Sequence, residues 1–192
     1  MSNIIFTYNQ EDALAAGQSG FINESGAYVI TIAEAKLGTA ESGAKFIEFS
    51  GDTDDGRKVN YLSVYSTKKD GELNKFGCNM INAIMGCSGV MQLTDRMITV
   101  NHFIAPEFSG KRVGLVLQKI LKTKNNGSET YSFDIKIPFV ADTRQTLQEK
   151  IDGATPTAID NILSTLKDKD ERKQVAKSSG LSNDFVDENI PF

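Results

Sequence analysis

Apolar residues recur with two different spacings along this 192-residue chain, one typical of strands and the other typical of helices. Runs dense in β-branched and aromatic residues predict strands at residues 27–32, 45–49, 57–66, 111–121 and 130–140. Between the third and fourth of these runs, apolar residues recur at helical spacing, which predicts a helix that Asp70 caps and Gly86 ends. The apolar positions of this helix are Leu73, Phe76, Met80 and Ile84.

Turn signals lie between these elements. Asp55-Gly56 predicts a hairpin, residues 37–43 predict a loop, and residues 122–128 predict a polar, basic hairpin loop. Residues 1–25 are expected to be an extended lead-in, and residues 87–110 favour no single assignment. After residue 142 we expect short helices; the better one opens at Thr155-Pro156, because proline is favoured at the first helical position. Its apolar stripe consists of Ile159, Ile162, Leu163 and Leu166.

The predicted order of elements indicates a fold class. Three strands, a helix and two strands are the order of an OB-fold, a Greek-key barrel with one helix between strands three and four. We therefore expect a mainly β chain with a C-terminal helical segment and a flexible acidic tail. The expected division is an OB domain with its lead-in at 1–141, a helical linker segment at 142–177 and the acidic tail at 178–192.

Alternation along the second and third strands directs aromatic side chains out of the predicted barrel. Leu62 and Val64 suit the interior of the third strand, and Phe46 points outward from the second strand. The outward face of the third strand then consists of Arg57, Val59, Tyr61, Ser63 and Tyr65. Outward rings beside basic groups in this region of an OB-fold are typical of single-strand binding, where stacking contributes about 1–3 kcal/mol per base. The alternative is that these rings pack under the lead-in or the C-terminal helix.

Charge is unevenly distributed along the chain. The net charge is −4, but residues 1–56 carry −7, residues 57–140 carry +6 and residues 141–192 carry −3. A basic middle suits a polyanionic partner despite the negative total. Phosphate contacts release counterions, so affinity for such a partner would fall with salt; a solvated surface is the alternative. The expected phosphate contacts on the last two strands and their loop are Lys111, Arg112, Lys119, Lys122, Lys124 and Lys136.

The last nine residues combine three carboxylates with an Ile-Pro-Phe end. An exposed aromatic ring beside the α-carboxylate can fill an apolar pocket while basic side chains bind the charge. This end resembles the C-terminal peptide of bacterial single-stranded DNA-binding proteins, although Asn189 replaces a usual acid. The resemblance implies that the tip binds replication and repair partners and does not itself hold DNA; an ordinary frayed terminus is the alternative. The expected partner-binding residues are Asp184, Phe185, Asp187, Glu188, Ile190, Pro191 and Phe192.

A second resemblance covers roughly residues 20–140 and rests on scattered positions. These positions are Gly26 to Ile30, Ser42-Gly43, Asp55 to Val59, Lys69 to Gly71, Phe76, Asn82, Met85 and Ser109 to Lys111. They look like the corresponding positions of phage-encoded single-stranded DNA-binding proteins. That resemblance implies an OB-fold that protects DNA during replication or recombination.

Sites for enzyme chemistry are not expected. His102 has no partner that its spacing supports, and a hairpin turn accounts for the acids of residues 52–55, which lack the later Glu of a calcium loop. No phosphate-cradling Gly-Lys-Ser/Thr loop and no zinc spacing occurs. We therefore expect no catalytic residue, no metal and no cofactor.

The sequence also bears on location. Cys78 and Cys87 suit small buried positions, which favours a reducing compartment. No run of 18 apolar residues and no signal peptide is seen, so neither membrane insertion nor export is expected. The expected location is the cytoplasm, that of the host if the protein is phage-encoded.

These observations favour a non-catalytic protein that binds and protects single-stranded DNA without strong sequence preference. Its setting would be phage DNA replication, recombination or repair, with partner proteins recruited through the C-terminal tip. One alternative is an OB-like adaptor that modulates host recombination or replication machinery, and another is a single-strand annealing protein. RNA as the ligand and assembly into a homo-oligomer both stay open.

Overall fold

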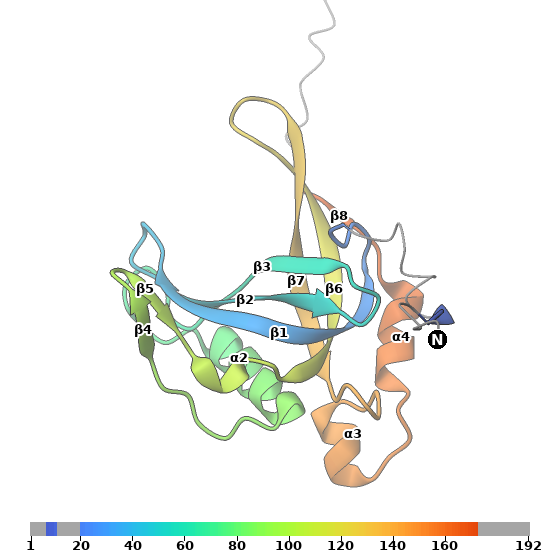
Figure 1. Ribbon diagram of the computed structural model, residues 1–192. Helices are drawn as coiled ribbons and strands as arrows, with labels where there is room; N and C mark the ends of the chain where they lie inside the picture. The colour runs from blue at the N-terminus through green and yellow to red at the C-terminus, as the bar shows by residue number, and fades with distance from the viewer. Residues whose placement is uncertain (1–6, 11–19, 173–192) are drawn as a thin grey trace, which may run out of the picture.

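The computed structural model describes residues 7–10 and 20–172 and confirms the prediction of a mainly β fold (Figure 1). The strands are β1 (Gly26–Thr39), β2 (Lys45–Thr53), β3 (Lys58–Tyr65), β4 (Arg96–Thr99), β5 (His102–Ile104), β6 (Arg112–Thr123), β7 (Glu129–Phe139) and β8 (Lys169–Asp170). The helices are α2 (Lys75–Ser88), α3 (Leu147–Asp152) and α4 (Ala158–Thr165), with a 3₁₀ turn η1 (Pro106–Phe108). In the part of the chain that the structure describes, each helix is too short or too polar to form a membrane span.

The long strand β1 joins the two halves of an eight-stranded sheet. Its first half pairs with β6, its second half pairs with β5 on the same side, and β2 pairs with it along residues 30–39. A register shift between Ile32 and Glu34 marks a bulge in this strand, and bulges bend strands. The ladders between the longer strands are antiparallel, whereas the short β8 adds to β6 in parallel.

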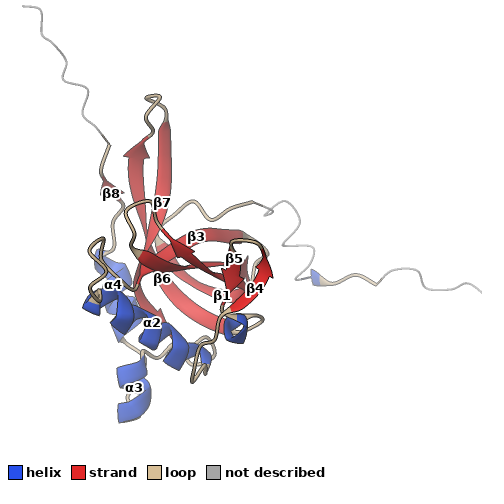
Figure 2. Cartoon of the chain, turned by 90° about the vertical axis from the view of Figure 1, so that its left-hand side faces the viewer, coloured by secondary structure: helices blue, strands red, loops and turns tan. Residues whose placement is uncertain are grey.

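The curved sheet brings β7 close to β3, and α2 packs against both strands. Figure 1 shows α2 beneath β1, β2 and β3, and the β6–β7 hairpin rising beyond the rest of the sheet. In Figure 2 the helices gather at the end of the molecule opposite this hairpin. We call the projecting part of the hairpin, residues 119–133, the arm.

Strand β6 is covered on both faces. Val113, Leu115 and Leu117 belong to the main core, which α2 closes, whereas Val116 lies in a second core with Phe139. A strand buried on both faces reads as a continuous apolar run, as residues 113–117 do apart from one glycine. The second core also takes up the predicted apolar stripe of α4, which is Ile159, Ile162, Leu163 and Leu166.

The predicted loop at residues 37–43 is partly wrong, because β1 continues to Thr39. Gly38 belongs to this strand and pairs with Phe46 of β2. An added Cβ at Gly38 would lie 2.3 Å from the Phe46 ring, so the glycine leaves the space that the ring fills. The glycine that suggested a loop therefore has a packing role inside a strand.

The expected alternation in the third strand is wrong at Val59, which is buried. The register between β2 and β3 shifts between Phe49 and Gly51, so Val59 and Leu62 both face the core. Tyr61 lies between them with a φ of 62°, and its ring is exposed. The outward direction predicted for Tyr61 is therefore right, but a bulge and not simple alternation produces it.

The predicted limits of the first helix are also wrong. The α2 cap is Asn74, whose side chain accepts a hydrogen bond from the first turn, whereas Asp70 accepts one from Glu72 in the preceding turn. The helix ends at Gly89, whose φ is 72°, three residues past Gly86. A left-handed residue is what the end of the helix requires, and Gly86 lies inside the last turns.

Other helical residues depart from the prediction as well. Leu73 precedes α2, and Phe76 lies at its start with its ring exposed, so Met80 and Ile84 are the buried members of the predicted stripe. Pro156 stands two residues before α4, which begins at Ala158. The unassigned residues 87–110 form the end of α2, the β4–β5 hairpin and η1, which add a hairpin to the predicted order.

The second core gives a test of how α4 is attached. Ile159 is 1% exposed against Val116 and Phe139, whereas Ile151 on α3 is 77% exposed. Because a buried truncation leaves a cavity, we expect Ile159→Ala to lower the free energy of unfolding by about 2–4 kcal/mol in urea denaturation. The matched Ile151→Ala should change it by less than about 0.5 kcal/mol. Equal effects of the two substitutions would contradict the described packing.

Candidate functional site

A groove follows the seam between β3 and β7. The two strands lie close together, yet within the described ranges no ladder joins them. Toward the arm, residues 58–61 of β3 and 130–133 of β7 line a pocket of about 610 Å³, which we call the arm pocket. Toward α2, residues 63–65 of β3, residues 134–136 of β7 and the start of α2 line a pocket of about 230 Å³, the helix pocket. Consecutive parts of the same two strands thus form both pockets.

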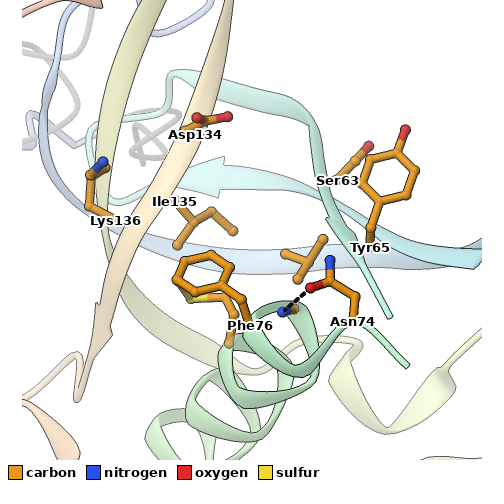
Figure 3. Close-up of a pocket in the computed structure, with 10 residues that line it drawn as sticks. Ser63, Tyr65, Asn74, Phe76, Asp134, Ile135 and Lys136 are labelled. Carbon is orange, nitrogen blue, oxygen red and sulfur yellow. Dashed lines mark hydrogen bonds between the residues drawn. The ribbon is translucent and has the colours of Figure 1, made fainter. Parts of the chain in front are cut away.

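Several aromatic rings are exposed along this groove. Tyr61 is 77% exposed and Tyr131 is 40% exposed in the arm pocket, where Phe21 of the preceding segment joins them. Tyr65 and Phe76 are exposed at the helix pocket (Figure 3). Exposed rings offer flat faces to a planar ligand, and such a cluster is unusual for a surface without a binding role.

Tyr61 is held outward by its backbone. A φ of 62° is uncommon for a residue other than glycine and costs about 1–2 kcal/mol. Strained backbone of this kind collects at functional sites, where the surrounding structure maintains it. Here the ladders on both sides of the bulge fix the position of Tyr61.

The aromatic surface continues from the groove onto β2. Phe46 pairs with Tyr65 across the β2–β3 ladder, and the two ring centroids are 5.5 Å apart in a tilted arrangement. On its other side the Phe46 ring lies over Gly38. The predicted outward rings Phe46, Tyr61 and Tyr65 are therefore all on the surface side of β2 and β3, with Phe46 half-buried.

The cations of the groove are lysines. Lys58 and Lys124 line the arm pocket, Lys136 lines the helix pocket, and Lys119 lies 4.8 Å from the centroid of the Tyr131 ring. None of the four forms an ion pair with a carboxylate of the described residues. Their charge is therefore available to an anionic ligand.

Both predicted arginines lie away from the groove rings. Arg57 precedes β3, donates to Asp55 at 2.6 Å and covers the ring of Tyr28 at 5.3 Å. The hydrogen bonds from Arg57 lower the pKa of Asp55 to about 2. Arg112 bridges Asp54 at 2.7 Å and Asp142 at 2.9 Å. The predicted alternation of Arg57 with Tyr61 and Tyr65 does not bring its guanidinium to them, because the turn carboxylate engages it.

Two predicted lysines lie outside the two pockets and away from their rings. Lys111 borders a shallow surface pocket with Met91 and Glu107, beyond the end of α2. Lys122 is on the arm, close enough to Glu171 to contribute to the lowered pKa of that carboxyl, which the hydrogen bond from Lys169 mainly causes.

The groove contains residues that the sequence pattern does not identify as site residues. Lys58 is assigned inward by simple alternation, and Phe76 is assigned to the buried helix stripe. Tyr131 lies on β7, the strand on which Lys136 is the only predicted DNA-binding residue. The pairing of β6 with β7 is the feature that could have identified Tyr131 as a site residue. It places Tyr131 opposite Leu121 on the arm and close to Lys119. The remaining unpredicted aromatic residues are Phe21 and Phe133.

The predicted partner-binding residues, Asp184 to Phe192, lie outside the described residues. Their proposed role stays a prediction.

Metal-ligating and nucleophilic side chains are the other groups with possible chemistry in the described part of the chain. No cluster of three or more metal-ligating side chains occurs there. Burial raises the pKa of Cys87 to about 11, which disfavours the nucleophilic thiolate. His102, for which spacing suggests no partner, lies 3.1 Å from Glu34 on the neighbouring strand.

The chain matches no model of a known protein family, and no curated protein sequence matches it. Its function is therefore inferred from the chemistry of the groove.

The backbone of Tyr61 gives a test of the site geometry. Because glycine relieves the left-handed strain while losing more entropy on folding, Tyr61→Gly should change the free energy of unfolding by less than about 1 kcal/mol. The same substitution at Tyr65, which has ordinary strand geometry and packs on Phe46, should lower it by about 1–2 kcal/mol. Urea denaturation of both variants checks this difference. A larger loss for Tyr61→Gly than for Tyr65→Gly would contradict the bulge.

Proposed function

We propose that this protein binds single-stranded DNA along the β3–β7 groove, without strong sequence preference and without catalysis. The observation that carries the proposal is that exposed rings and unpaired lysines share one groove. Unpaired bases can stack on rings such as Tyr61 and Tyr131, each stacked base contributing about 1–3 kcal/mol. The lysines beside the rings can neutralise the phosphates that follow the bases.

Duplex DNA suits this groove less well. Its bases are stacked on each other and paired, so their faces are not available to the exposed rings. Recognition of unpaired bases by aromatic stacking is the mode that single-strand binding domains use. The position of the rings along a seam between two strands also fits a flexible strand better than a rigid rod.

The arrangement of strands supports an OB-fold as the architecture of this domain. Bent β1 pairs with both β2 and β6, β7 lies next to β3, and α2 follows the third strand. These are features of a partly open Greek-key barrel, and OB-folds bind oligonucleotides on the face of strands two and three. In this interpretation the β4–β5 hairpin is an insertion between the helix and the fourth barrel strand.

The biological setting follows from the two sequence resemblances. We propose a phage-encoded protein that protects single-stranded DNA during replication, recombination or repair in the host cytoplasm. The acidic tip at Asp184 to Phe192 would recruit replication or recombination proteins. The groove would hold the DNA and the tip would hold the partners.

Two other functions remain alternatives. An OB-like adaptor would use the tip alone, and single-stranded DNA would then leave the tyrosine fluorescence of the groove unchanged. A single-strand annealing protein would bind through the same groove and would in addition accelerate pairing of complementary strands. An annealing assay separates this alternative from simple protection.

Salt dependence tests the role of the lysines. The four lysines of the groove, Lys58, Lys119, Lys124 and Lys136, predict a log–log slope near −2.8 for oligo-dT binding, at about 0.7 per phosphate. Removing two of them in a Lys124→Ala/Lys136→Ala protein should reduce the slope to about −1.4. A salt titration followed by tyrosine fluorescence or anisotropy measures both values.

The matched control is Lys111→Ala/Lys150→Ala, which removes the same charge from exposed positions outside the groove. Its slope should equal that of the unmodified protein, and duplex DNA of equal length should bind more weakly than oligo-dT. A slope that responds equally to both double substitutions would contradict the proposed site.

The ring of Tyr61 provides a test that is separate from folding. Since Tyr61→Gly is expected to leave stability nearly unchanged, its effect on binding reports the loss of the ring itself. We expect the affinity for oligo-dT to fall by about 1–3 kcal/mol, while Tyr61→Phe keeps a stacking face and stays near the unmodified affinity. Titration of labelled oligo-dT measures the three affinities. Unchanged binding by the glycine variant would remove Tyr61 from the site.

A further inference from the structure

The helix pocket contains a carboxylate that binding of a polyanion does not explain. Asp134 of β7 lines this pocket, and its side chain is exposed. It forms neither a hydrogen bond nor an ion pair with another described residue, although its charge acts on Lys169 at longer range. A carboxylate that faced the phosphates of a bound strand would repel them. Asp134 is therefore compatible with bound DNA if it faces the bases.

The pocket beside Asp134 combines a buried apolar floor with exposed aromatic rings. Val64 and Met80 are buried in its floor, and the exposed rings of Tyr65 and Phe76 stand at its mouth. Figure 3 shows Phe76 between Ile135 and the start of α2, with Asp134 above it on the rim. The volume of about 230 Å³ is several times the ~30 Å³ of one water and below the roughly 300–1,000 Å³ of pockets for drug-sized ligands. A single nucleobase is a ligand of this size and polarity.

The polar groups on the rim determine which base suits the helix pocket. Asp134 can only accept hydrogen bonds when ionised. The side-chain oxygen of Asn74 is already used by the backbone N–H of Gly77 at 3.3 Å, which leaves its amide N–H groups as donors. Cytosine and adenine carry an exocyclic amino group that donates, whereas thymine presents a carbonyl oxygen at the corresponding position. A thymine oxygen beside the carboxylate would leave two acceptors facing each other.

We infer that the helix pocket receives one unpaired base and that Asp134 accepts a hydrogen bond from its amino group, so this position prefers cytosine or adenine to thymine. The inference rests on the proposed function and adds a discriminating subsite to it. The arm pocket, which is larger, stacks bases without selecting them. The protein therefore binds strands of any sequence but favours those that place an amino-bearing base in the helix pocket.

The test compares two homopolymers on three proteins. Labelled oligo-dC and oligo-dT of about 12 nucleotides, within the ~4–16 nucleotides that one OB-fold covers, are titrated by fluorescence anisotropy. The unmodified protein should bind oligo-dC about 5-fold or more tightly than oligo-dT, the lower end of the discrimination that hydrogen bonds to a base edge supply. Asp134→Asn should bring this ratio close to 1, because an amide can rotate to donate as well as accept.

The ratio separates recognition from simple electrostatics. Removing a negative charge at residue 134 should raise the affinity for both homopolymers, but a charge effect alone leaves their ratio unchanged. Asp152→Asn removes the same charge from an exposed position on α3 and should keep the full preference for oligo-dC.

Three results would overturn the inference. Equal affinity of the unmodified protein for the two homopolymers would remove the subsite. A preference for oligo-dC that survives Asp134→Asn would assign it to another group. Absence of binding to either homopolymer would instead overturn the proposed function, and the subsite with it.

Discussion

The groove depends on a close backbone contact between the first turn of α2 and the end of β3. A Cβ added to Gly77 would lie 1.8 Å from the carbonyl oxygen of Tyr65, so a larger residue would push the helix away from the strand. The backbone N–H of Asn74 donates to the carbonyl of Ser66 at 2.9 Å, and the Cys78 thiol donates to the same oxygen. Held in this way, α2 packs against both β3 and β7 and occupies the lower end of the seam. No β-ladder joins the described edges of β3 and β7 there, and the side chains of the two strands line a groove.

The basic side chains of the domain divide into two groups with different physical roles. Arg57 and Arg112 form short ion pairs with carboxylates near the β2–β3 turn, where a planar guanidinium can make several directed hydrogen bonds. The groove instead carries lysines, which are compact charges on flexible stems. Such charges can follow a phosphate backbone whose position varies from one nucleotide to the next. The arginines are therefore neutralised by neighbouring carboxylates, whereas the groove lysines form no ion pair within the described residues.

The strand pattern is sufficient to predict much of this arrangement. It predicts the first three strands, the helix after them and the long final hairpin, since these elements carry strong periodic signals. It also names Tyr65 and Lys136 as candidate binding residues, and both line the helix pocket. Predictions fail where a single tertiary contact overrides a local signal. Gly38 marks a loop by composition, but in the folded chain it makes room for the Phe46 ring.

The other failures have the same origin. Simple alternation cannot foresee the bulge that turns Val59 inward, because the extra residue is defined by the partner strand. The direction of Arg57 depends on Asp55, which competes for it within the turn. Phe76 fits a helical stripe perfectly by spacing, yet the stripe begins one turn before the core does. The contribution of β7 to the groove depends on the curvature of the sheet, which brings β7 close to β3. No local sequence pattern encodes this curvature.

The short strand β8 determines where the chain leaves the described domain. Lys169 and Asp170 add to the outer edge of β6, and Arg172 joins Glu129 of β7 at 2.9 Å. The end of the described chain is thereby fastened along the arm, up to Glu129 beside the hairpin loop, at the far end of the molecule from α3 and the loop that follows it. The described chain therefore ends along the same hairpin that supplies Tyr131 and Lys124 to the arm pocket.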